Sequence, residues 1–187
     1  MRALKDHSME AFTHTVETWH DFYVMMGTTS ATLMGLLFVS LSINVDTITR
    51  KENDDLRVLA TQTFASFLTV LLFAVLFLIP RQTPRGLALP LFGIGGFGLF
   101  ITIRRFFRAR QSQQRRWGRK YLTSRFRLPI VCYASSLPIA VLILMSSTSA
   151  LYWLVPVMIL LIMDASLNAW HLLLRLRDPG GEGRGKG

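Results

Sequence analysis

Five apolar segments, each long enough to cross a lipid bilayer, follow one another along the chain. A transmembrane helix needs roughly 20 predominantly apolar residues. The segments cover residues 22–45, 58–80, 86–103, 128–147 and 150–174. The last two are separate spans, because together they are far too long for one crossing and the polar stretch SSTS lies between them. The pattern predicts an all-α, polytopic helical bundle of about five transmembrane helices.

The composition agrees with residence in a membrane. Of the 187 residues, 51% are hydrophobic and 17% are charged, whereas a soluble domain carries about 25% charged residues. Cys132 is the only cysteine, which excludes a disulfide or a multi-cysteine metal site within one chain. We therefore expect a single membrane domain and predict no cofactor and no metal site.

The segments outside the spans have different expected roles. Residues 1–21 contain four acidic side chains, which is the wrong charge for the start of a signal peptide. We expect this part to be an external amphipathic segment at the membrane interface, followed by a transmembrane bundle over residues 22–174. Residues 175–187 are rich in glycine and are expected to form a flexible cytoplasmic tail.

The distribution of lysine and arginine predicts the orientation of the bundle. Cytoplasmic loops carry an excess of these residues. Residues 104–127 contain ten of them, residues 175–187 contain four, and the loop around Arg50, Lys51 and Arg57 contains three. The segments on the other side contain only four in all. The N-terminus is therefore expected outside and the C-terminus inside.

The first span carries a family resemblance. The stretch WHDFYVMMGTTSATLMGLLFVSLSINVD, residues 19–46, has an aromatic pair leading into the pattern GTxxATLxGLLFVxLS. It resembles the N-terminal signature of a family of small bacterial integral-membrane proteins for which no activity is established. The resemblance implies a multi-pass protein of the bacterial cytoplasmic (inner) membrane, and it implies no mechanism.

Small residues recur along the first span. Gly27, Ala31 and Gly35 are four residues apart, so one face of the helix lacks bulk and lets another helix approach closely. Thr28 and Thr32 lie beside this face. The pattern is typical of a helix packing face, but the hydroxyls also fit a helix that lines a pore or cavity.

Polar faces on the second and fifth spans are expected to meet. Gln62 and Ser66 are four residues apart, as are Asp164 and Asn168, so each pair lies on one helical face. At 1.5 Å rise per residue, both pairs fall within roughly 15 Å of the cytoplasmic ends of their spans. An ionised aspartate at the bilayer centre costs about 2.5–3.5 kcal/mol. Such a residue either handles an ion or proton or holds the helices in register by hydrogen bonding.

The segment 104–127 combines arginines with aromatic side chains directly after a span. This pattern is typical of a cytoplasmic helix that binds anionic lipid headgroups, and it also fits a basic vestibule that attracts anions. Nucleic acid is not an expected partner. The candidate lipid- or anion-binding residues are Arg104, Arg105, Arg108, Arg115, Arg116, Arg119 and Lys120.

The glycine-rich stretch GIGGFG in the third span, residues 93–98, superficially resembles a potassium-channel filter. A filter needs a re-entrant loop, whereas this stretch runs straight on into further apolar residues. We interpret it as a kinked or closely packed helix.

Motifs of known enzyme classes are not found, so an enzyme is not expected. The sequence favours a small homo-oligomeric protein that forms an ion-conducting or transport pathway. In this hypothesis Thr28, Thr32, Gln62, Ser66, Asp164 and Asn168 line the pathway or form a buried polar cluster. The alternative is a membrane-embedded accessory, sensor or scaffold protein that acts through helix packing and contacts with anionic lipids.

Overall fold

The computed structural model describes residues 16–49, 54–80, 83–112, 119–145, 147 and 149–177. Within these ranges the side chains of residues 47, 54–55, 108–112, 119–126 and 177 are not included. Most of the predicted external segment and most of the predicted tail, residues 1–15 and 178–187, lie outside the described residues.

The described part of the chain is helical. The elements are α2 (His20–Ile43), α3 (Val45–Thr49), α4 (Asp54–Leu78), α5 (Pro84–Ser112), α6 (Arg119–Leu144) and α7 (Ser149–Arg177). Five of these are long and apolar enough to cross a membrane. The predicted all-α bundle with five spans is confirmed, and the chain is a multi-pass membrane protein.

The glycine-rich third segment forms a full span. Its helix, α5, is continuous over 29 residues although Pro90 lies inside it. Proline removes one backbone hydrogen bond from a helix, a loss that neighbouring helices make tolerable in membranes. Residues 93–98 lie inside this helix, which agrees with the interpretation of the stretch as helix and not as a filter loop.

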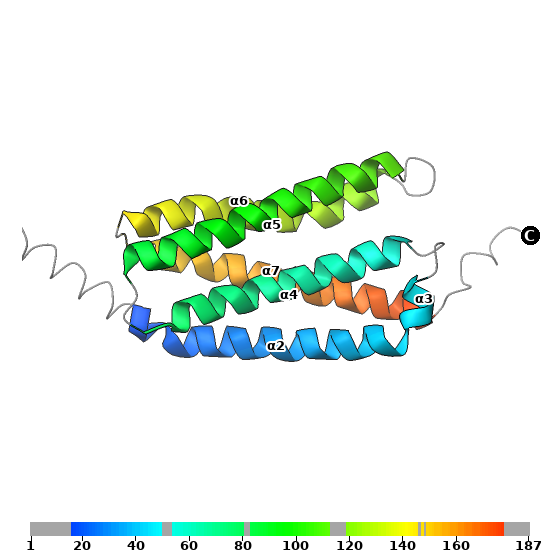
Figure 1. Ribbon diagram of the computed structural model, residues 1–187, viewed down its shortest axis with the longest axis horizontal. Helices are drawn as coiled ribbons and strands as arrows, with labels where there is room; N and C mark the ends of the chain where they lie inside the picture. Colours follow the sequence, from blue (N-terminus) through cyan, green and yellow to red (C-terminus); the bar gives the residue numbers. More distant parts are fainter. Residues whose placement is uncertain are drawn as a thin grey trace, which may run out of the picture.

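The five long helices run alternately in opposite directions (Figure 1). α5 packs along α6 on one side of the bundle, α2 packs along α4 on the other, and α7 contacts both α4 and α6. One end of the bundle carries α3 and the ends of α5 and α7. We call it the basic end, because Arg57 of α4, Arg105 of α5 and Arg175 of α7 lie towards it. Towards this end, the ribbons of α5 and α6 diverge from that of α4 (Figure 1).

Glycines bring α5 and α6 together. A Cβ atom added at Gly98 would lie 2.7 Å from Cε1 of Tyr133, and one added at Gly95 would overlap the Ser136 hydroxyl. A side chain at either position would therefore push the helices apart. The interpretation of GIGGFG as closely packed helix is confirmed, and its effect is to place the ring of Tyr133 against the α5 backbone.

A second close contact joins α2 to α4. A Cβ atom added at Gly27 would lie 3.0 Å from the Cβ of Ala74, and the Ser30 hydroxyl donates a hydrogen bond to the Phe67 carbonyl oxygen at 2.6 Å. Ala31 and Gly35 are exposed on the same helix. Packing at these two positions stays a prediction, and it would require a second chain.

Substituting Gly27 with alanine is expected to lower the free energy of unfolding by about 1 kcal/mol, because inserting a methyl group into a packed contact forces the backbones apart. Titration with a denaturing detergent measures this quantity. Gly35→Ala is the matched control, because a Cβ atom there meets nothing within 4 Å among the described residues. Equal destabilisation by both substitutions would contradict the α2–α4 contact.

Candidate functional site

Buried polar side chains gather inside the bundle. Half of them lie in the middle of α4, and the others come from α2, α5, α6 and α7. The buried polar residues are Ser30, Gln62, Thr63, Ser66, Thr69, Thr102, Ser136 and Asn168. In a lipid-embedded protein, polar side chains that face the interior mark pathways or helix contacts.

The polar face of α4 results from helical spacing. Gln62, Ser66 and Thr69 are separated by four and three residues, so they lie on one face, and all three are buried. The Thr69 hydroxyl is 2.9 Å from the Ala65 carbonyl oxygen one turn earlier. Such a back-bond satisfies a hydroxyl inside a helix, so Thr69 can be buried without loss.

Tyr133 is the centre of the polar cluster. Its ring is fully buried and is held against Gly98 of α5. Its hydroxyl lies 3.1 Å from the Thr69 hydroxyl, and either group can be the donor. The Ser66 hydroxyl and the Arg105 guanidinium also lie close enough to act on the phenol. Tyr133 thus connects α4, α5 and α6.

Several atoms of this cluster have unused hydrogen-bonding capacity. Among the described residues, both amide atoms of Gln62, the Ser66 hydroxyl and Nη1 of Arg105 are buried without a hydrogen-bond partner. A buried polar group left unsatisfied costs about 1–3 kcal/mol, and lipid offers it no replacement. These groups are therefore available to bind water or a polar solute.

Asp164 lies at the edge of this cluster. It is half-buried, and the Asn168 side-chain nitrogen donates a hydrogen bond to its Oδ2 at 3.0 Å. Its carboxylate also acts electrostatically on the thiol of Cys132 in α6. The predicted contact between the second and fifth spans is confirmed at the level of the helices, because α4 packs against α7.

The threonines of the first span do not join the cluster within one chain. Thr28 and Thr32 are exposed on α2, and the Thr32 hydroxyl donates to the Thr28 carbonyl oxygen at 2.8 Å. Their role in lining a pathway stays a prediction that requires a neighbouring copy of the chain.

The two arginines at the start of the basic segment differ in their surroundings. Arg104 is exposed, whereas Arg105 is half-buried with Nη1 directed into the protein. The other basic residues predicted to bind lipids or anions lie outside the residues whose side chains the structure describes. They are Arg108, Arg115, Arg116, Arg119 and Lys120.

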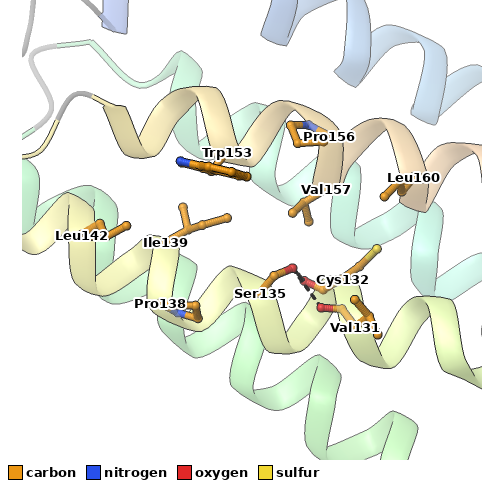
Figure 2. A pocket seen from close by; sticks show the side chains of 10 residues that line it. All are labelled: Val131, Cys132, Ser135, Pro138, Ile139, Leu142, Trp153, Pro156, Val157 and Leu160. Atoms are coloured by element: carbon orange, nitrogen blue, oxygen red, sulfur yellow. Dashed lines mark hydrogen bonds between the residues drawn. The ribbon is translucent and has the colours of Figure 1, made fainter.

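A separate apolar groove of about 340 Å³ lies between α6 and α7 (Figure 2). Trp153 and Pro156 line it from α7, and Pro138 and Ile139 face them from α6. The Ser135 hydroxyl in the groove donates to the carbonyl oxygen of Val131 at 2.9 Å. With its hydroxyl thus bonded, the groove is suited to hydrocarbon and not to a polar solute.

Sequence reasoning missed Tyr133 and the inward direction of Arg105. A tyrosine six residues inside a span, rather than at the membrane interface where tyrosine is enriched, was the available signal. Its partners could not be named, because the sequence does not show which helix lies beside which.

Comparisons with protein-family models, with curated proteins and with solved structures find no match. The resemblance of the first span to small bacterial membrane proteins therefore stays an expectation, and the function must be argued from the polar cluster.

Proposed function

We propose that this chain forms a homo-oligomer in the bacterial inner membrane and provides a pathway for an ion or a small polar solute. The observation that carries the proposal is the burial of the Gln62 amide in a span, where neither its oxygen nor its nitrogen has a hydrogen-bond partner in the described part of the chain. Transport requires polar groups inside the membrane that are free to replace the hydration of a solute.

A purely structural role for the polar cluster does not account for the unsatisfied amide of Gln62. Polar side chains that hold helices together satisfy one another, as Ser30 does with the Phe67 carbonyl oxygen at 2.6 Å. Gln62 lies on the same helix as that contact, and its amide forms no such bond to any described residue. Burial of an unsatisfied polar group destabilises the fold, and binding a solute offsets this cost.

The oligomer is proposed from the exposure of α2. Only 22% of its apolar window is buried within the chain, compared with 56% for that of α4. The face that contains Ala31 and Gly35 is open to close approach by a second helix. The same face supports the second candidate function, an accessory or scaffold protein that binds another membrane protein there.

A flux measurement on proteoliposomes tests the proposal. The wild-type protein is expected to carry ions, and Asp164→Asn to change the rate about tenfold. A unit charge about 8 Å from an ion contributes roughly 2 kcal/mol at an effective dielectric constant of 20. The rate rises if the ion is negative and falls if it is positive.

Asp46→Asn is the matched control, because Asp46 is an exposed acid in α3 at the basic end of the bundle. It is expected to leave the rate unchanged. Absence of flux from a folded, oligomeric wild-type sample would contradict the transport function and leave the accessory function.

A further inference from the structure

We propose that the cluster around Tyr133 is a binding site for a small monovalent inorganic anion such as chloride, held by Ser66, Arg105 and Tyr133. This inference rests on the proposed function, because it names the class of solute that the pathway carries. It assigns to Arg105 a role different from that of the exposed arginines of the basic segment.

The first argument is the chemistry of the unpartnered atoms. Arg105 Nη1 and the Gln62 amide nitrogen can only donate hydrogen bonds, and the Ser66 hydroxyl has a proton to donate. None of these has an acceptor among the described residues. A guanidinium is always charged, so its buried nitrogen requires an acceptor, and an anion provides both the acceptor and the opposite charge.

The second argument is convergence. The Tyr133 hydroxyl of α6 lies 3.1 Å from the Thr69 hydroxyl of α4, and Ser66 lies one turn before Thr69 on the same face of α4. Arg105 lies two helical turns after Gly98 on the same face of α5, where Gly98 lies against the Tyr133 ring. Three helices thus bring donors towards Tyr133. Gln62 lies one helical turn from Ser66 on the same face of α4, where its amide can bind the anion on the way to this position.

The hydrogen bond between Thr69 and Tyr133 can adapt to the anion. Without an anion, Tyr133 donates to Thr69, which donates to the Ala65 carbonyl oxygen. When an anion is bound, Thr69 donates to Tyr133 across the same 3.1 Å contact. The phenol proton is then free for the anion, and no atom other than hydrogen has to move.

Asp164 of α7 has a hydrogen-bond donor of its own. The Asn168 side-chain nitrogen donates to its Oδ2 at 3.0 Å. The carboxylate is therefore bonded to a residue outside the three that hold the anion.

The positive charge of the chain favours the approach of anions. The sequence has a formal net charge of +10, and residues 104–127 hold ten lysines and arginines. A field of one sign raises the local concentration of counter-ions and their rate of entry. A single inward arginine matches an anion with a single charge.

A thermal-stability titration of the full-length protein in detergent tests the site. Sodium chloride is exchanged for sodium gluconate at constant ionic strength, because gluconate is too large to enter a packed bundle. The wild-type melting temperature is expected to rise with chloride and to saturate. Arg105→Gln and Tyr133→Phe are each expected to raise the chloride dissociation constant at least tenfold, because each removes a donor from the anion.

Arg57→Gln is the control, because it removes the same charge from an exposed arginine at the same end of the bundle and is expected to retain chloride binding. If Arg105→Gln does not fold, Tyr133→Phe decides the result. Equal stability in chloride and gluconate would overturn the proposal. Equal weakening by the Arg57 and Arg105 substitutions would do the same, because it would indicate general surface attraction.

The failure of this site and the failure of the proposed function give different results. Saturable chloride binding in a protein without flux supports the site and contradicts transport. Flux of sodium or potassium with no specific effect of chloride on stability supports transport and overturns the anion site.

Discussion

Gly98→Ala is expected to lower the free energy of unfolding by about 2 kcal/mol and to impair the polar cluster at the same time. The new Cβ atom would lie 2.7 Å from Cε1 and 2.9 Å from Cδ1 of Tyr133. An aromatic ring cannot bend away as a flexible side chain can, so the ring or α5 has to move. Overpacking of this kind costs typically 1–3 kcal/mol.

Displacement of the ring also moves the Tyr133 hydroxyl from its 3.1 Å contact with Thr69. We therefore expect weaker chloride binding as well as lower stability. Denaturing-detergent titration gives the first quantity, and the chloride titration gives the second.

Gly93→Ala is the matched control for this substitution. A Cβ atom at Gly93 has nothing within 4 Å among the described residues, and alanine is the better helix former. Its stability is expected to equal or slightly exceed that of the wild type. If Gly98→Ala is as stable as Gly93→Ala, this result would contradict the close packing of α5 against Tyr133.

The spans could be predicted because their signal is local. A run of apolar residues long enough to cross the bilayer forms a helix wherever it lies, since its backbone groups must bond within the segment. The five helices therefore lie within a few residues of the predicted segments. Even the glycine-rich segment is a continuous helix, α5.

The polar cluster could be predicted only in part. The spacing of four residues predicted that Gln62 shares a helical face with Ser66, and Asp164 with Asn168. Their similar depth in the membrane predicted that the two helices are in contact. Which neighbours those faces meet depends on the order of the helices around the bundle, and spacing within one helix holds no information on that order. The contribution of α6 through Tyr133 was therefore missed.

The small-residue face of α2 could also be predicted only in part. Gly27, Ala31 and Gly35 form one line in the sequence, yet Gly27 packs against Ala74 while the other two are exposed. Residues four apart turn by about 40° around the helix at each step, so this line leaves the contact face, which continues through Ser30 and Leu37. The remainder of the face is available to a second chain.

Gln62→Leu is expected to reduce flux without lowering the free energy of unfolding. Gln62 is 3% exposed, and its amide has no hydrogen-bond partner in the described part of the chain. Replacing it with an apolar residue of similar size removes an unsatisfied polar group, so the free energy of unfolding should stay the same or rise by about 1 kcal/mol. Flux should fall at least tenfold, because the pathway loses a group that binds the solute.

Thr61→Val is the control for Gln62→Leu. Thr61 is the preceding residue, is exposed, and donates its hydroxyl to the Arg57 carbonyl oxygen at 2.7 Å. Its substitution removes a polar group from the outer face of the same helix. Both flux and stability are expected to remain close to those of the wild type.

The most direct test of the central claim is to measure flux and unfolding free energy on the same preparation of Gln62→Leu. The claim is that the buried amide of Gln62 binds a solute and does not hold the helices together. It predicts a protein at least as stable as the wild type with flux reduced tenfold or more. A protein destabilised by more than about 1 kcal/mol, or a stable one with unchanged flux, would contradict it.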